Sequence, residues 1–229
     1  MPRSDAITTT QSEGYEARVA RQVPGLRDLH RMAGILLAER VPPSGRVLVL
    51  GAGGGLELRA FAQMRPDWRF DGVDPSADML ALARANLGDL QGRVAFHQAY
   101  IEEMPRILFD GATCLLTLHF LPRKARLDTL RELHRRLTAG APLVVAPHSF
   151  SIHDRSGERW LARNAAFHGA EGRAPGEAMA QIDAMRKNLP ALTPREDEEL
   201  LAEAGFSDIE LFYAGFSFRG WACHASRSA

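Results

Sequence analysis

The chain has 229 residues, of which 45% are apolar, enough for one domain with a sizeable core. Its 28 basic and 28 acidic residues give a formal net charge of +0, which argues against nucleic acid or a membrane surface as partner. No apolar run approaches the ~18–20 residues of a membrane span, and residues 1–14 lack the apolar core of a signal peptide. Cys114 and Cys223 lie far apart and form no CxxC pair, which fits a reducing cytoplasm.

The first half of the chain alternates between helix and strand patterns. Residues 1–12 are polar, and we expect them to be mobile. The run at Val47–Leu50 is apolar throughout, as in a strand that is buried on both faces of a parallel sheet. The expected elements are a helix at 26–39, a strand at 47–50, a helix at 56–64, a strand at 69–73, a helix at 77–87 and a short strand at 94–97.

The alternation continues to residue 147 and then breaks. We expect a strand at 111–118, a helix at 124–137 and a strand at 142–146. Residues 149–190 are polar and rich in Arg, Ala and Gly, so we interpret them as a helical insertion that covers the strand ends. A helix at 196–204 then leads into two β-rich runs joined near Ala214–Gly215, which predicts a closing hairpin.

A glycine-rich turn follows the first expected strand in VLVLGAGGGLELRAFA, Val47–Ala62. Gly51 permits a sharp bend, and Gly53 and Gly55 remove Cβ atoms where a ligand or a strand would pass. In an α/β sheet, ligands lie outside the carboxyl ends of the strands, and this turn stands at such an end. A tight turn without any ligand is the structural alternative.

An acidic residue in FDGVDPSADML indicates which kind of ligand the glycine turn would bind. Asp74 ends the second strand about 20 residues after the glycines, the spacing that places a carboxylate beside a ribose. A helix N-cap is the structural alternative, and the two roles are compatible. A dinucleotide motif, G-x-G-x-x-G, would need a third glycine at Leu56. The observed G-x-G-x-G spacing therefore favours a nucleoside with an amino-acid tail and argues against a nicotinamide oxidoreductase.

These residues resemble the class I S-adenosylmethionine-dependent methyltransferases, and the resemblance extends along nearly the whole chain. VLVLGAGGG and GVDPSADML are similar to the first two motifs of the family, and VAFHQAYIEEMP lies where its third strand and adenine loop occur. FDGATCLLTLHFLP and AEAGFSDIELFYAGFSFRGWACHA resemble its fourth strand and closing hairpin. The resemblance implies an α/β fold with a Rossmann-like sheet of seven strands, mostly parallel with a reversed last strand, and helices on both faces.

The resemblance also implies S-adenosylmethionine as cofactor and a set of contacts to it. The methionine part would lie on the glycine turn and beside the end of the fourth strand, the ribose on Asp74, and the adenine beside Tyr100 and Ile101. Two positions depart from the family: Val49 stands where an acid is common, and Tyr100 replaces the usual Asp of the adenine loop. The expected cofactor-binding residues are Gly51, Ala52, Gly53, Gly55, Asp74, Pro75, Met79, Tyr100, Ile101, Leu115 and Leu116.

We divide the chain accordingly. Residues 1–45 would form an N-terminal tail and cap helices, and 46–148 the cofactor-binding core. Residues 149–193 would form a helical insertion or lid, and 194–229 the C-terminal helix and closing β-hairpin of the same domain. We expect substrate specificity to reside in the insertion, because it leaves the sheet on the ligand side.

A narrower resemblance links the chain to the carboxy-S-adenosylmethionine synthases, which modify the cofactor. ARQVPGLRDLHRMAGILLAERV and ELFYAGFSFRGW carry this similarity. That subfamily holds the additional carboxylate with an Arg in the helix before the C-terminal AGF, where this chain has Leu200, and its Tyr after VPG is Leu26 here. The missing groups favour an ordinary methyltransferase on the same scaffold.

Methyl transfer is an in-line displacement, so the enzyme mainly has to position the acceptor. A base is needed only when the acceptor must lose a proton. His148 and His153 follow the fifth strand and are candidate bases, with ordinary loop histidines as the structural alternative. No histidine has metal-ligand spacing.

We therefore expect a methyltransferase for a small-molecule acceptor, through O or N rather than C. A cofactor-modifying enzyme and a non-catalytic S-adenosylmethionine-binding protein are the alternatives. The sequence leaves the oligomeric state open, with a homodimer as one option.

Overall fold

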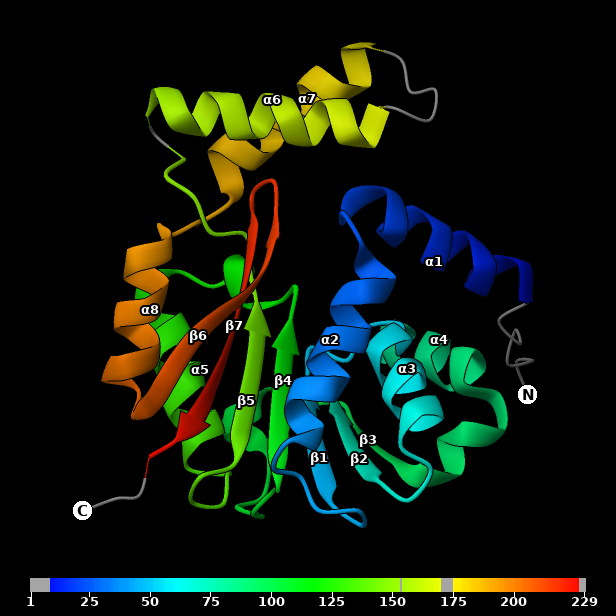
Figure 1. Cartoon of the computed structure of the whole chain (residues 1–229). Helices are drawn as coiled ribbons and strands as arrows, with labels where there is room; N and C mark the ends of the chain where they lie inside the picture. The colour runs from blue at the N-terminus through cyan, green and yellow to red at the C-terminus, as the bar shows by residue number, and fades with distance from the viewer. Residues whose placement is uncertain (1–8, 153, 170–174, 227–229) are drawn as a thin grey trace.

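A computed structural model of the chain describes residues 9–152, 154–169 and 175–226 and contains one seven-stranded sheet (Figure 1). The strand order is β3-β2-β1-β4-β5-β7-β6, with β1 to β5 mutually parallel and β7 antiparallel to both of its neighbours. The predicted fold, a mostly parallel sheet with a reversed last strand, is confirmed. The strands are β1 (Arg46–Leu50), β2 (Arg69–Val73), β3 (Val94–His97), β4 (Gly111–Leu115), β5 (Pro142–Ala146), β6 (Phe206–Gly215) and β7 (Phe218–Ala225).

Helices cover both faces of the sheet, because successive side chains of a strand point to opposite sides. In β1, Leu48 and Leu50 belong to the core under α5 and α8, whereas Val47 and Val49 belong to the core under α2, α3 and α4. The described helices are α1 (Thr9–Gln22), α2 (Leu26–Ala38), α3 (Leu56–Met64), α4 (Ala77–Leu87), α5 (Arg123–His134), α6 (Arg155–Gly169), α7 (Pro175–Asn188) and α8 (Pro194–Glu203).

Three helices lie above the carboxyl ends of the strands, where α1, α6 and α7 form the upper part of the molecule in Figure 1. Helices α6 and α7 fall within the expected insertion and pack on one another, and α1 contacts α6. They enclose a small apolar cluster of their own, which consists of Phe150, Ile152, Leu161, Ala165 and Ile182. The site beneath these helices is therefore covered by segments from both halves of the chain.

Helix starts follow local capping chemistry. The Ser76 Oγ accepts a hydrogen bond from the Met79 N–H at 3.3 Å and begins α4 directly after Asp74. Helix α8 begins with a capping box, in which Thr193 and Glu196 satisfy each other's backbone N–H groups, and Pro194 occupies the first turn. These caps fix where each helix begins relative to the strand ends.

Three boundaries differ from the sequence predictions. The fourth strand was expected to reach residue 118, but β4 ends at Leu115 because Leu116 has φ 56° and turns the chain into a short 3₁₀ helix, Leu118–Phe120. The hairpin turns at Phe216–Ser217 rather than at Ala214–Gly215, since β6 extends to Gly215. Residues 9–12, expected to be mobile, begin α1, and residues 1–8 lie outside the described part of the chain.

A buried ion pair joins α5 to α8. The Arg126 Nη1 donates to Asp197 Oδ1, and the Arg126 Nη2 donates to the Pro190 carbonyl at 3.0 Å. Arg126 is 0% exposed and Asp197 is 4% exposed, so water screens neither charge. Within the described ranges, no helix has the length and apolar character required to cross a membrane.

Candidate functional site

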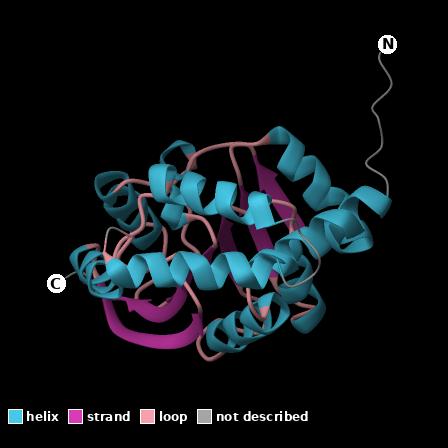
Figure 2. Ribbon diagram, turned by 90° about the horizontal axis from the view of Figure 1, so that it is seen from above, coloured by secondary structure: helices cyan, strands magenta, loops and turns pink. Residues whose placement is uncertain are grey.

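Two adjoining cavities open at the carboxyl ends of β1, β2 and β4, the side of the molecule that Figure 2 shows from above. The first has a volume of about 460 Å³ and is bordered by α1, α6 and α7. The second, of about 830 Å³, lies between the end of β2 and α5. Gly51, Asp74, Thr117 and Phe120 line both cavities, so that one ligand can extend from one into the other.

The glycine turn after β1 is anchored to the end of β2. The Gly51 N–H donates to the Val73 carbonyl at 2.8 Å. Gly51 has φ 75°, and a Cβ on it would lie 2.0 Å from Thr117 Oγ1, so glycine is required there. Gly53 has φ 47° and lines the first cavity beneath the Tyr15 hydroxyl. Two features therefore constrain this turn: the positive φ angles of its glycines and the close approach of the Thr117 and Tyr15 side chains.

Gly55 was expected to contact the cofactor, but its surroundings indicate a packing role. It lines neither of the two cavities, and a Cβ on it would lie 2.9 Å from the Ala83 Cα of α4 and 3.1 Å from the Leu87 side chain. Gly55 is therefore needed where α3 begins against α4, and the element that passes it is a helix rather than a ligand.

Asp74 follows β2 at the boundary between the two cavities. Its Oδ2 accepts a hydrogen bond from the Gly53 N–H and its Oδ1 accepts one from the Ser76 N–H, each at 2.9 Å. Asp74 thus holds the glycine turn and the segment that leads into α4, whose N-cap is Ser76 rather than Asp74. Each carboxylate oxygen can accept a second hydrogen bond. The same side chain can therefore accept the two hydroxyls of a ribose that lies across the turn.

The second cavity is lined by residues that the sequence analysis placed beside the adenine. Pro75, Tyr100 and Ile101 line it, as the sequence predicts for the adenine side. Ile101 is buried, whereas Tyr100 is 58% exposed, and the Tyr100 N–H donates to Glu103 Oε2 at 2.7 Å. Met79, expected in the same group, lines the first cavity instead.

The end of β4 contributes the floor of the first cavity. Ala52, Leu115 and Leu116 line it, in agreement with their expected place beside the glycine turn. Thr117 and Phe120, which the sequence analysis did not select, border both cavities from the segment that follows. The FD…LHFLP stretch was the available signal for them, but their position depended on where β4 ends.

Charge in the first cavity gathers around Tyr15 of α1. The Tyr15 hydroxyl accepts a hydrogen bond from the Gly54 N–H at 3.3 Å, and burial raises its pKa. Arg18, Glu57 and Asp74 act electrostatically on this hydroxyl, and all three line the same cavity. The charged end of the cavity is therefore the end next to the glycine turn.

Glu57 supplies a carboxyl group near Val49, the position where an acid is common in the family. Val49 pairs with Thr113 between β1 and β4, and the Thr113 hydroxyl donates to Glu57 Oε1 at 2.7 Å. Glu57 is buried, and this burial raises its pKa to about 8. The sequence analysis missed this residue, although an acid in the first turn of the helix after the glycines was visible.

The raised pKa of Glu57 makes stability fall as pH rises. The ordinary pKa of the carboxyl is 4.5, so between that value and about 8 the unfolded chain binds fewer protons than the folded one. The free energy of unfolding then decreases by up to about 1.4 kcal/mol per pH unit. We expect Glu57→Gln to remove most of this slope between about pH 7 and pH 8 in urea denaturation. Glu102→Gln, at an exposed position, is the control, and an unchanged slope in Glu57→Gln would contradict the assignment.

Histidines also line the first cavity. The His119 and His148 rings lie 4.7 Å apart, and the His148 N–H donates to His119 Nδ1 at 3.2 Å. Burial lowers the pKa of His148 to about 3 and that of His30 to about 4, so both rings are neutral at pH 7. His168 of α6 is the fourth histidine that lines this cavity.

Of the two candidate bases, the structure describes one. The His148 ring is stacked on Phe218 with centroids 3.8 Å apart, and its Nδ1 lies 2.9 Å from Ser217 Oγ. With a pKa of about 3 the ring is a weak base at neutral pH, so this geometry favours a packing role. His153 lies outside the described residues.

Helix α6 carries polar atoms that find no partner within the described ranges. The His168 Nε2 lies 3.0 Å from the Gln22 carbonyl, whereas its Nδ1 is enclosed and unpaired. One turn earlier, both amide atoms of Asn164 are also enclosed without a partner. An enclosed polar atom without a hydrogen bond costs about 1–3 kcal/mol. The sequence analysis did not select His168 or Asn164, because their surroundings depend on how α6 packs over the sheet.

Comparison with known proteins agrees with this geometry. Residues 47–140 match the family described as methyltransferase domain. Residues 47–140 thus form a class I S-adenosylmethionine-dependent methyltransferase domain. Carboxy-S-adenosyl-L-methionine synthases from Campylobacter jejuni subsp. doylei and Haemophilus ducreyi are each 23% identical to the chain. The alignments cover 89% of this chain and 87% of the first relative, and 87% and 84% for the second.

Solved structures place the methyltransferase domain in the same fold. An O-methyltransferase family protein from Burkholderia thailandensis superposes with a TM-score of 0.68 at 14% identity, over 98% of this chain and 62% of that one. An O-methyltransferase family 2 protein from Planctomyces limnophilus, in complex with apigenin, superposes with a TM-score of 0.63 at 16% identity, over 97% and 63%. The chain thus spans less than two thirds of the length of these solved proteins.

S-adenosylmethionine is the cofactor of the methyltransferase domain, and the residues present fit it. Asp74 has acceptor capacity left for ribose hydroxyls, and Gly53 lines the first cavity beside it. The apolar second cavity suits adenine, and the charged end of the first cavity suits the amino-acid tail. No group of three or more His, Cys, Asp or Glu in the described part of the chain could hold a metal ion.

Proposed function

We propose that the protein transfers a methyl group from S-adenosylmethionine to an oxygen or nitrogen of a small molecule. The observation that carries the proposal is the position of Asp74 between two cavities, one apolar and one with a charged and an uncharged end. The cofactor, when bound, supplies an electrophilic methyl group on a sulfonium. The protein's part is to hold the acceptor in line with that group and to exclude water, which can supply perhaps 7–11 kcal/mol of the barrier.

Each part of the site would then have a separate task. Asp74 would hold the ribose, Ile101 and Tyr100 would flank the adenine, and Glu57 would face the tail of the cofactor. Residues 149–193 would act as the lid, because α6 and α7 border the first cavity through His168, Met185 and Leu189. We place the protein in the cytoplasm, where its two buried free cysteines would stay reduced.

Incubation with methyl-labelled S-adenosylmethionine and a panel of small metabolites tests the proposal. Label should pass to a small molecule and S-adenosylhomocysteine should accumulate. Calorimetry with S-adenosylhomocysteine and NAD serves as the binding control, and tighter binding of NAD would overturn the reading of the glycine turn. Cofactor binding without transfer to any compound would favour a non-catalytic role.

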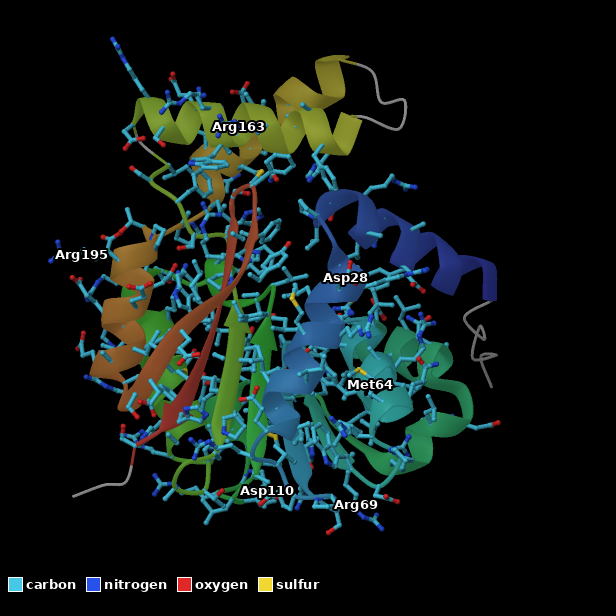
Figure 3. All side chains as sticks on the ribbon, in the orientation of Figure 1. Asp28, Met64, Arg69, Asp110, Arg163 and Arg195 are labelled. Carbon is cyan, nitrogen blue, oxygen red and sulfur yellow. The ribbon has the colours of Figure 1, made fainter. Side chains whose placement is uncertain are left out.

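Carboxy-S-adenosylmethionine synthesis is the second candidate, since the curated relatives carry that name. The site offers little for an additional carboxylate. Arg18 is the single Arg or Lys among the described residues that line the first cavity. Leu200 lies in the core beneath α8, and Arg195 projects from the outer surface of α8 (Figure 3).

We therefore expect no carboxylated cofactor as product. An unpaired carboxylate in a closed pocket would cost several kcal/mol. Mass spectrometry of reactions that contain S-adenosylmethionine and prephenate, the carboxyl donor of that subfamily, provides the measurement. Accumulation of carboxy-S-adenosylmethionine would refute this expectation and make the second candidate the function.

A further inference from the structure

We propose that the uncharged end of the first cavity binds a neutral ring compound whose hydroxyl or N–H group donates a hydrogen bond to His168 Nδ1. This inference rests on the proposed function and names the class of acceptor. His168, which the sequence analysis did not select, is thereby assigned as an acceptor-binding residue.

The distribution of charge supports a neutral ligand. Arg18 and Asp74 both act electrostatically on the Tyr15 hydroxyl, so these formal charges of the cavity lie near the glycine turn, whereas the raised pKa of Glu57 leaves that carboxyl mostly protonated at pH 7. Apart from these residues, the described side chains that line the cavity belong to histidine, aliphatic and aromatic residues and to Gln22 and Thr117. An anion or cation bound among these side chains would lose its hydration without gaining an opposite charge.

The shape of the surrounding side chains supports a ring. Phe218 and Phe120 border the cavity from the hairpin and from the segment after β4, while Met185 and Leu189 border it from α7. The stacking of Phe218 on His148 shows that a flat ring is already accommodated against this wall. Aromatic and thioether groups favour contact with a flat apolar ring over contact with an extended polar chain.

The hydrogen bond of His168 to α1 determines which of its nitrogens can bind the acceptor. A backbone carbonyl only accepts, so the Gln22 carbonyl requires the proton on His168 Nε2 and leaves Nδ1 as an acceptor. That Nδ1 is enclosed and has no partner in the described part of the chain, as are both amide atoms of Asn164 on the same side of α6. His168 is 5% exposed and its ring lines the cavity. A donor from a ligand is the contact that this arrangement lacks.

The same atom can take the proton of a hydroxyl acceptor. When the acceptor oxygen is alkylated, its O–H bond breaks, the bonding pair stays on oxygen and the proton passes to Nδ1. The resulting imidazolium keeps its Nε2–H toward the Gln22 carbonyl. Gln22 ends α1, where exposed carbonyls carry partial negative charge that stabilises a cation.

Three naphthalenes serve as probes for the full-length protein in the presence of S-adenosylhomocysteine. 2-Naphthol is neutral and has a donor, 2-methoxynaphthalene has none, and 2-naphthoate is an anion. We expect 2-naphthol to bind about five- to tenfold more tightly than either of the others, measured by calorimetry. Tighter binding of 2-naphthoate, or no binding of any probe, would overturn the proposal without the use of any variant.

Two variants separate acceptor binding from the contact with α1. His168→Gln keeps a donor that reaches the Gln22 carbonyl but loses the acceptor at the Nδ1 position, and it should reduce the preference for 2-naphthol to less than about twofold. His168→Asn keeps an acceptor near Nδ1 and should retain most of the preference. If both variants keep the wild-type preference, His168 does not bind the acceptor.

His134→Asn is the matched control, because His134 also has an enclosed nitrogen without a partner among the described residues but lines neither cavity. It should leave the preference unchanged. Calorimetry with S-adenosylhomocysteine alone, on every variant, separates this inference from the proposed function. If the cofactor binds but naphthol preference is absent, only the acceptor assignment fails.

Discussion

Asp74→Ala is expected to weaken binding of S-adenosylhomocysteine by about 2–4 kcal/mol, because two ribose hydroxyls lose a charged acceptor. The variant also removes the acceptor for the Gly53 N–H, so part of the loss will come from the glycine turn. Isothermal calorimetry gives the affinity, and thermal denaturation shows whether the fold persists. We expect the protein to remain folded, since the sheet and both cores do not depend on Asp74.

Two further variants make the result specific. Asp74→Asn keeps one oxygen acceptor and should lose less affinity than the alanine variant. Asp78→Ala removes an exposed carboxyl from the first turn of the same helix and should bind normally. If Asp74→Ala is folded and binds within about twofold of wild type, Asp74 only holds the glycine turn and the segment that leads into α4.

Arg126→Met should lower the free energy of unfolding by about 3–5 kcal/mol, since Asp197 then stays buried without its partner. Asp197 is buried, and burial already raises its pKa while Arg126 acts to lower it. Chemical denaturation of the variant measures the loss directly. The pair joins α5 to α8 and lines neither cavity, so cofactor affinity should change little in the folded protein.

The double variant Arg126→Met/Asp197→Leu identifies the cause of that loss. Replacing both charges removes the unpaired carboxylate, and most of the stability should return. Arg131→Met is the control, because its ion pair with Glu203 is exposed and should contribute less than about 1 kcal/mol. Equal stability of the single and double variants would show that packing, rather than charge, explains the effect.

The sheet could be predicted from the sequence because its information is local. Apolar runs such as Val47–Leu50, the glycines after them and Asp74 at the end of the second strand lie within short windows. These motifs, with the family resemblance that they carry, predicted the fold and the cofactor class, and they placed the ligand at the edge of the sheet where the two cavities open. The end of β4 could not be predicted, since an apolar sequence continues through Leu116 while the backbone turns there.

The acceptor side of the site could not be predicted, because it is assembled from distant segments. His168 contacts the Gln22 carbonyl across 146 positions, and Tyr15 meets Gly54 across 39. Neither partner carries a sequence signal of its own. Gly55 shows the converse, since a glycine in a ligand-binding motif can be required by helix packing alone.

One strained backbone position lies beside the first cavity. Three non-glycine residues in the described ranges have positive φ, of which Leu116 lines the first cavity and Phe216 forms the hairpin turn next to Phe167 of α6. A bulky residue held in this conformation costs on the order of 1–2 kcal/mol. The Leu116 N–H still donates to the Ala146 carbonyl at 2.9 Å, so the rigid sheet sustains the strained turn. The strained turn therefore lowers folding stability beside the first cavity. A search for heat-resistant variants would select substitutions that relax this turn, and those substitutions would change the site.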